Sequence, residues 1–392
     1  MSKINVHSIS FKLIIGGCIL TLIPMLIIGW ISISKSSNAL LHIGQENLRE
    51  QAHEIAALVE TNLELQADTA SIFATGEHLV TTLETVKDFG ADGATEDLQR
   101  LRNELKKAYK TLDDHFLGIF ITNTEGLLLT GELASGKEYK GSNISTRGYF
   151  QEAKKTKQAA VGEIVRSKST GKLIYVVCAP ILSDSGDFLG VFGMSVKAQF
   201  LVDLISGTKY GKTGYGWMLN KDGVFIAHPN EKNILTLDAT TLDGMEEIVK
   251  GMKNQEKGVQ GYVFKGITKI AGFAPVPMKK WSIALTQDEA EFLETPNAIR
   301  NYIAIVVLLS MVIVAVIIMI TSKTIIKPIN DTVASLKDIS EGEGDLTTRL
   351  EIRTKDEVGQ LSGRFNDFIE KLQIMIRDIQ NGVNTLSSSS TE

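Results

Sequence analysis

The chain has 392 residues, of which 43% are hydrophobic and 22% charged, and its formal net charge is -5. This composition excludes an intrinsically disordered chain, and it lacks the basic excess typical of nucleic-acid binding, so we expect no nucleic-acid partner. The length also exceeds that of one ordinary domain.

Two uncharged runs, residues 13–34 and 301–322, are each 22 residues long. As helices they would span about 33 Å, slightly more than the roughly 30 Å hydrocarbon core of a bilayer, so both are predicted to be transmembrane helices. The first could instead be a cleaved signal peptide, but it is too long and lacks a small-residue cleavage site. The second could be a buried core helix, but it is apolar on every face, which favours lipid.

The charges beside these runs predict the topology. Basic residues lie before the first run and after the second, namely Lys3, Lys12, Lys323 and Lys327. Acidic residues lie shortly before the second run, namely Glu289, Glu291 and Glu294. The positive-inside rule therefore places residues 1–12 and the chain after 322 in the cytoplasm, and residues 35–300 outside. We expect a multi-pass protein of the cell inner membrane, with its outer region periplasmic or extracellular.

Residues 35–89 are predicted to form one long helix. The segment contains no proline and only two glycines, and its apolar residues recur mostly at three- and four-residue steps. A stripe of this spacing is more often core or dimer seam than binding site. The glycine-rich segment 90–97 is expected to end the helix.

The next part of the chain changes to short strands rich in β-branched and aromatic residues. Residues about 110–200 contain several such strands with a short helix at RGYFQEAKK, and after a linker helix near 198–206 the pattern repeats over about 207–290. We expect two similar α/β modules in tandem. GTKYGKT and SKSTGKL resemble phosphate-binding loops, but the first has one residue too few between its glycines and the second has Arg166 where the first glycine belongs. We interpret both as turns.

Beyond the second apolar run the chain becomes helical again. Seven apolar residues alternate three- and four-residue steps, which predicts a coiled-coil seam: Val358, Leu361, Phe365, Phe368, Leu372, Met375 and Ile379. Val333, Leu336 and Ile339 form a shorter stripe before a break at Gly342 and Gly344.

The sequence offers little support for catalysis. The six histidines form no set with metal-ligand spacing, and no nucleophile, kinase or cyclase motif is present. We therefore expect no enzymatic activity, no metal and no cofactor. His228 is interpreted as a residue flanking a turn at the end of a strand.

This arrangement resembles the bacterial chemoreceptors, or methyl-accepting chemotaxis proteins, with a double Cache sensor followed by a HAMP linker. Pro328, the GDLTTRL segment, DEVGQL and FNDF carry the likeness to HAMP, while STRGYF, SKSTGK, GKTGYGW and AHPN carry the likeness to the sensor. The resemblance implies an α+β membrane receptor with two PAS-like Cache modules, a parallel coiled-coil HAMP over 323–376, and the start of a cytoplasmic signalling helix at 377–392.

The resemblance also implies partners. Such receptors are homodimers that gather into trimers of dimers and act on the CheA kinase and the CheW adaptor. The hairpin that would contact these proteins is not in the sequence, so we expect a truncated receptor. The same front end occurs in sensor histidine kinases and diguanylate cyclases, and a membrane-anchored binding protein is a third possibility.

In one amino-acid-binding subclass, the membrane-distal module surrounds its ligand with an arginine, aromatic residues and an aspartate. Arg147, Tyr149 and Phe150 match the arginine and its aromatic pair. A guanidinium binds carboxylates through two parallel hydrogen bonds, and the rings would exclude water. The alternative is a structural arginine that ties down a loop.

The other positions of that subclass differ here. Ser142 and Val165 replace tyrosines, and Ser195 replaces the aspartate. A neutral Ser195 does not offset a buried ammonium, so we expect a small organic carboxylate as ligand. Tyr175 and Phe120 are predicted to add to the pocket wall. In the HAMP segment, Pro328 and Glu357 are predicted to act in signal relay.

Overall fold

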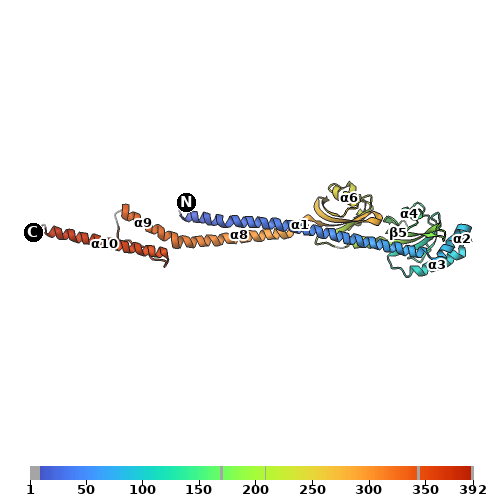
Figure 1. The fold of residues 1–392 in the computed structure, drawn as a ribbon, viewed down its shortest axis with the longest axis horizontal. Coiled ribbons are helices and arrows are strands. Elements are labelled where there is room, and N and C mark those ends of the chain that lie inside the picture. The colour runs from blue at the N-terminus through green and yellow to red at the C-terminus, as the bar shows by residue number, and fades with distance from the viewer. Residues whose placement is uncertain (1–8, 168–170, 208, 342–344, 390–392) are drawn as a thin grey trace. The chain divides into compact units, whose positions relative to one another are not determined.

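The computed structural model describes residues 9–167, 171–207, 209–341 and 345–389. Four predicted features lie partly or wholly outside this part of the chain: residues 1–8 of the cytoplasmic N-terminus, 168–170 of the SKSTGK turn, 208 of the GTKYGKT turn, and the break at Gly342 and Gly344. Residues 390–392 also lie outside it. The fold has two compact units, one formed by Ser37–Glu294 and the other by the chain before and after it (Figure 1).

The first helix, α1 (Ile9–Ala74), contains the first apolar run and continues into the sensor unit. It does not reach residue 89 as one helix, so that prediction is wrong. Gly76 adopts an extended conformation (φ -62°, ψ 122°), and α2 (Glu77–Gly93) begins after it. The expected glycine break is also present, because Gly90 inside α2 has φ 75° and α3 (Thr95–Tyr109) follows.

The first module is an antiparallel sheet in the order β2-β1-β6-β5-β3, with β4 paired to β5. Its strands are β1 (Phe116–Thr122), β2 (Leu128–Leu133), β3 (Ala160–Val161), β4 (Val165–Arg166), β5 (Leu173–Leu182) and β6 (Phe188–Lys197). Helix α4 (Gly148–Thr156) confirms the short helix predicted at RGYFQEAKK.

The second module repeats this topology in the order β8-β7-β11-β10-β9. Its strands are β7 (Tyr215–Leu219), β8 (Phe225–Ala227), β9 (Gly258–Phe264), β10 (Ile267–Val276) and β11 (Trp281–Asp288). Helix α5 (Gln199–Ser206) joins the modules, and α6 (Glu246–Lys253) covers part of the second sheet. The predicted tandem of α/β modules is confirmed.

Helix α1 packs against one face of both sheets. Its buried residues recur at three- and four-residue steps and share one core with the sheets: Leu48, Ala52, Ala56, Val59 and Leu63. Gly272 in β10 approaches the backbone at Leu48 so closely that a Cβ there would overlap it. Further along α1, Gln66 accepts a hydrogen bond from the Tyr175 hydroxyl at 2.8 Å. The other face of each sheet has a separate core.

The other unit contains two helices that are long and apolar enough to cross a membrane, judged by length and composition. The first part of α1 lies beside α8 (Glu294–Thr321) in antiparallel fashion, since Ile303 packs at Gly29 and Ile318 at Gly17. A π-helical turn (Ser322–Ile326) leads into α9 (Lys327–Glu341), and α10 (Glu357–Ser389) follows a connector.

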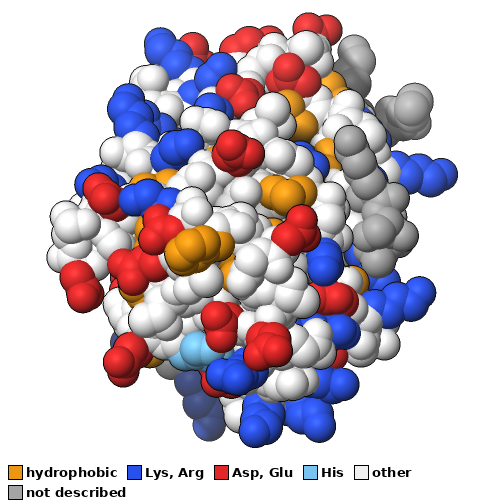
Figure 2. All heavy atoms as spheres, turned by 90° about the vertical axis from the view of Figure 1, so that its right-hand side faces the viewer, with side chains coloured by type: hydrophobic (Ala, Val, Ile, Leu, Met, Phe, Trp, Pro, Cys, Tyr) orange, Lys and Arg blue, Asp and Glu red, His pale blue; other side chains and the backbone are white. Residues whose placement is uncertain are grey.

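Figure 2 shows the surface of the end of the molecule that carries α2 and α3. Basic and acidic side chains are mixed over this face, and apolar side chains are scattered singly. A surface of mixed charge has no strong field of one sign, so this face gives no reason to expect a polyanionic partner.

Candidate functional site

Arg147 lies at the start of α4, where it is the N-cap residue with an extended backbone (φ -75°, ψ 134°). Its carbonyl accepts the N–H groups of Phe150 and Gln151 at 3.1 Å, which begins the helix. Its side chain is exposed and, within the described part of the chain, forms no hydrogen bond or salt bridge. The guanidinium can therefore bind an external anion.

Tyr149 is half-buried, and its ring lies over Gly162 in the β3–β4 connection. A Cβ at Gly162 would be 2.7 Å from the Tyr149 Cδ1 atom, so only glycine allows this contact. The Tyr149 carbonyl accepts the Cys178 thiol at 3.6 Å. Burial holds the pKa of the Tyr149 phenol well above its usual range, so the hydroxyl remains neutral and able to donate.

Phe150 and Phe120 are each 1% exposed and belong to the core on the α4 face of the first sheet. Phe150 packs edge-on against Phe188 with ring centroids 5.9 Å apart, and Phe120 packs against Tyr139 at 5.2 Å. The Phe120 ring lies over Gly193, where a Cβ would overlap it. Both rings thus form the apolar part of this face.

Ser195 lies on the same face, because its neighbours across the sheet are Val176 of the α4-face core and Gly118. The residue is 2% exposed, and its hydroxyl has no hydrogen-bond partner among the described residues. An unsatisfied buried hydroxyl costs about 1–3 kcal/mol, and a ligand that hydrogen-bonds it would recover that free energy.

In the C-terminal segment, Pro328 is buried in the first turn of α9, and its carbonyl accepts the Thr332 hydroxyl at 2.9 Å. Glu357 is exposed as the first residue of α10. The residue that caps α10 is Asp356, whose carboxylate accepts the N–H groups of Val358 and Gly359 at 3.1 Å. This cap was not predicted from the sequence.

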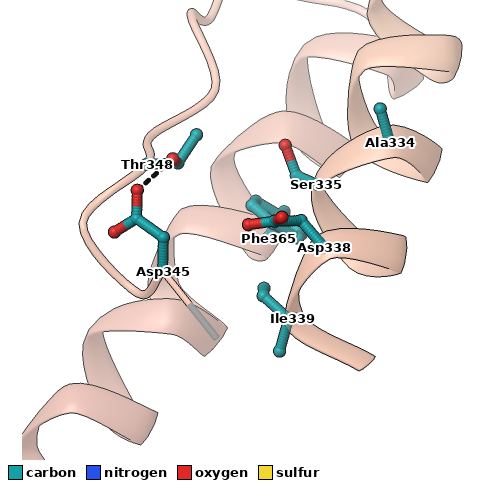
Figure 3. Close-up of a pocket in the computed structure, with 7 residues that line it drawn as sticks. All are labelled: Ala334, Ser335, Asp338, Ile339, Asp345, Thr348 and Phe365. Atoms are coloured by element: carbon teal, nitrogen blue, oxygen red, sulfur yellow. Dashed lines mark hydrogen bonds between the residues drawn. The ribbon is translucent and has the colours of Figure 1, made fainter. Parts of the chain in front are cut away.

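A hollow of about 210 Å³ lies between α9, the connector and α10 (Figure 3). Its lining comes from Ala334, Ser335, Asp338, Ile339, Asp345, Thr348 and Phe365. Asp345 accepts a hydrogen bond from the Thr348 hydroxyl at 3.2 Å. The connector is also held by the Asn366 side-chain amide of α10, which accepts the Leu350 N–H at 2.8 Å and donates to the Leu350 carbonyl at 2.9 Å.

The family described as the Cache domain matches residues 43–296, well over half of the chain. This range covers both sheets and the sensor part of α1. The chain belongs to the Cache domain family. The family described as the HAMP domain matches residues 320–374, which include α9, the connector and part of α10.

The chain is similar to chemoreceptors and to other sensors. It is 24% identical over 394 residues to methyl-accepting chemotaxis protein McpA of Bacillus subtilis, an alignment that covers 100% of this chain and 55% of McpA. The sensory domain of the Campylobacter jejuni chemoreceptor Tlp3 superimposes with TM-score 0.51 at 13% identity, over 67% of this chain and 100% of that domain.

The extracellular domain of a histidine kinase, mmHK1S-Z2, superimposes equally well, with TM-score 0.51 at 18% identity over 63% of this chain and 98% of that domain. The Cache fold alone therefore does not distinguish the two classes of receptor. The chain spans about half the length of the curated chemotaxis relatives that it matches over most of its own length.

Within this Cache sensor, the structure gathers Tyr149, Phe150, Phe120 and Ser195 on the α4 face, with Arg147 at the start of α4. It does not bring Tyr175 to them. Tyr175 faces α1, is fully buried in the other core and bonds Gln66. Side chains alternate along β5, so Val176 and Cys178 face α4 instead, and the prediction that Tyr175 lines the pocket is wrong.

Three residues of the α4 face were not predicted from the sequence. Gly162 and Gly193 admit the Tyr149 and Phe120 rings, and Tyr139 packs against Phe120. Glycines inside or beside predicted strands were the available signal, because such positions often mark a close approach.

His228 of the second Cache module is 6% exposed and lies among the rings of Tyr215, Phe225 and Phe264. Its Nδ1 accepts the Asn230 N–H at 2.9 Å. Burial, assisted by the Lys265 cation, lowers the pKa of His228 to about 4, so the ring is neutral. This environment favours the interpretation of His228 as a structural residue at the end of β8.

Proposed function

We propose that this chain is the sensing and relay part of a transmembrane chemoreceptor. A small organic carboxylate binds the first Cache module outside the inner membrane, and HAMP passes the signal to a cytoplasmic complex of CheA and CheW. The observation that carries this proposal is the order of Cache and HAMP domains in a chain that aligns along its whole length with a methyl-accepting chemotaxis protein. We expect no catalysis by the chain itself.

The ligand class follows from the charges on the α4 face. Among the residues that the structure describes, Arg147 offers an exposed cation with no acid bound to it, and Ser195 offers a buried hydroxyl with no partner. The hydrophobic core of this face supplies apolar and aromatic side chains around them. A carboxylate can bind Arg147, whereas an α-ammonium group would lose its hydration without gaining a counterion.

Dimerisation is supported by apolar residues that a single chain leaves exposed. On α1, Leu58, Leu65 and Ile72 recur at seven-residue steps and are 53%, 63% and 73% exposed. On α10, Phe368 and Ile379 of the predicted seam are 49% and 60% exposed. A heptad stripe is buried when a second identical helix lies parallel to it, so we propose a homodimer joined along α1 and α10. Trimers of such dimers would then form as in the receptors it resembles.

Pro328 and Glu357 are proposed to act in relay rather than in binding. Pro328 begins α9 and Glu357 begins α10, so each stands where a helix of the HAMP segment starts. Coupling free energies of about 1–3 kcal/mol between sites are sufficient for such a switch.

The test uses the whole chain in lipid nanodiscs and measures thermal unfolding and calorimetric binding. Acetate, pyruvate, lactate, malate and succinate are compared with alanine and other amino acids. A ligand at one hundred times its Kd would stabilise the sensor by about 2.7 kcal/mol. Arg147→Ala should abolish the effect of the active carboxylate, whereas Arg166→Ala, an exposed arginine of the same module, should retain it.

Two results would overturn the proposal. Equal carboxylate affinity in Arg147→Ala and the native chain would remove Arg147 from the site. Carboxylate binding that leaves hydrogen exchange in α9 and α10 unchanged would remove the relay function.

A further inference from the structure

The segment Gly211–Thr213, the last three residues of GTKYGKT, forms a tight loop at the start of the second Cache module, in agreement with the turn predicted there. Tyr210 and Gly214 close it with two backbone hydrogen bonds, of 2.8 and 3.2 Å. Gly211 has φ 60°, a left-handed conformation that glycine adopts without cost. The N–H groups of Lys212 and Thr213 form their hydrogen bonds outside the loop.

These N–H groups bind the carboxylate of Glu291, which lies in α7 (Glu289–Phe292). Lys212 N–H donates to Oε1 at 2.7 Å, while the Thr213 N–H and hydroxyl donate to Oε2 at 3.0 and 2.6 Å. The Thr213 hydroxyl oxygen also accepts the Asp288 N–H at 3.1 Å. Hydrogen bonds to a carboxylate are roughly twice as strong as bonds between neutral groups, so this is a firm attachment.

The fit around α7 is close on two sides. A Cβ at Gly211 would overlap Glu291 Oε1, and a Cβ at Gly44 of α1 would overlap the Phe292 ring. Lys212 also forms a salt bridge with Glu294, but both side chains are more than half exposed, so this pair adds little. The attachment of α7 therefore depends mainly on Glu291 and Thr213.

Helix α7 lies in the chain between β11 of the second module and α8, so its attachment affects how β11 is linked to α8. Strand β11 begins at Trp281, whose indole N–H donates to Glu163 of the first module at 3.1 Å. The strand ends at Asp288, α7 follows at once, and α8 begins at Glu294. A displacement of β11 must pass through α7 to reach α8, the outgoing helix that leaves the second module.

We propose that the Gly211–Thr213 loop is a carboxylate clamp that fixes the start of the outgoing helix to the second Cache module. Glu291 and Thr213 are the positioning residues through which module movement reaches α8. This inference deepens the proposed function and rests on it in one respect, that α8 carries the signal toward HAMP.

The experiment measures hydrogen exchange by mass spectrometry on the whole chain in lipid nanodiscs, without any added ligand. Thr213→Val removes the hydroxyl at nearly constant shape, and Thr213→Ser restores it. Glu291→Gln removes the charge, and Glu289→Gln is its matched control, since Glu289 lies in the same helix and forms no hydrogen bond or salt bridge in the described part of the chain.

We expect Thr213→Val and Glu291→Gln to speed exchange of the amides at 288–294 by about tenfold, and of those in α9 by about threefold. Thr213→Ser and Glu289→Gln should match the native chain in both segments. The α9 amides are the decisive readout, because a clamp that only stabilises α7 would leave them unchanged.

Unchanged exchange at 288–294 would overturn the clamp, and faster exchange there with unchanged α9 would overturn the relay role. If Thr213→Val also speeds hydrogen exchange in β10, its effect is not specific to the clamp. The comparison of Glu291→Gln with Glu289→Gln then decides whether the clamp holds α7. Because no ligand is used, failure here leaves the carboxylate test of the proposed function unaffected.

Discussion

The indole N–H of Trp281 donates to the Glu163 carboxylate at 3.1 Å, and this bond joins the two Cache modules. The other Glu163 oxygen lies 3.3 Å from Lys279 Nζ, a side chain that is 13% exposed. Glu163 directly follows Gly162, over which the Tyr149 ring lies. The α4 face of the first module, where the ligand is proposed to bind, is therefore joined through adjacent residues to a contact with the second.

Replacing Glu163 should weaken this junction. Glu163→Leu leaves the buried indole N–H and the Lys279 ammonium without an acceptor, and we expect a loss of about 1–3 kcal/mol in the free energy of unfolding. Glu163→Gln retains an acceptor for the indole and should lose less. Denaturant unfolding of both variants tests this order, and equal losses would contradict the role of the Trp281 bond.

Gly162→Ala should disturb the packing of the α4 face and the ligand site proposed there. The new Cβ would lie 2.7 Å from the Tyr149 ring, and overpacking of this kind costs about 1–3 kcal/mol. We expect a lower melting temperature and weaker carboxylate binding. Gly148→Ala is the matched control, because its Cβ would meet nothing within 4 Å. Normal carboxylate affinity in Gly162→Ala would show that the Tyr149 ring is not part of the site.

His228 should make the stability of the second module depend on pH. Its pKa is lowered from 6.5 to about 4 because the ring is buried, so the unfolded chain binds a proton that the folded chain does not. Stability should therefore fall as the pH drops from 6.5 to 4, by up to about 3 kcal/mol. Unfolding curves of the native chain and His228→Gln, measured across this range, should converge at low pH. Parallel curves would refute the prediction.

Leu65→Lys should weaken the proposed dimer without unfolding the chain. Leu65 is 63% exposed, so a lysine is tolerated in one copy, but two lysines would meet at the α1 seam. We expect a shift toward monomer in light scattering of the detergent-solubilised chain, with the melting temperature of the monomer unchanged. Leu65→Met serves as the control and should remain dimeric.

Asp356 should matter more than Glu357 for the stability of α10. Asp356 caps the helix through two backbone N–H groups, and loss of such a cap costs about 1 kcal/mol. Asp356→Ala should therefore speed hydrogen exchange in the first turn of α10, while Glu357→Ala should leave it nearly unchanged. An equal effect of both would mean that the cap does not hold this turn.

The sequence by itself determined the order of elements. The two uncharged runs, the change from three- and four-residue periodicity to alternation, and the second set of strands predicted two apolar helices and two α/β modules. These signals are local, because each depends on residues within one helix or strand. The short helix predicted at RGYFQEAKK is likewise present as α4.

Only the tertiary structure decided which side chains share a face and which residues meet from distant parts of the chain. Tyr175 and Val176 are neighbours in β5, but the pleat points one toward α1 and the other toward α4, and the sequence does not state which helix covers which face. Gly211–Thr213 was predicted only as a turn, and its partner Glu291 lies about eighty residues further along the chain. Such pairs depend on how the sheet orders its strands, and β7 and β11 are adjacent only once the second module has folded.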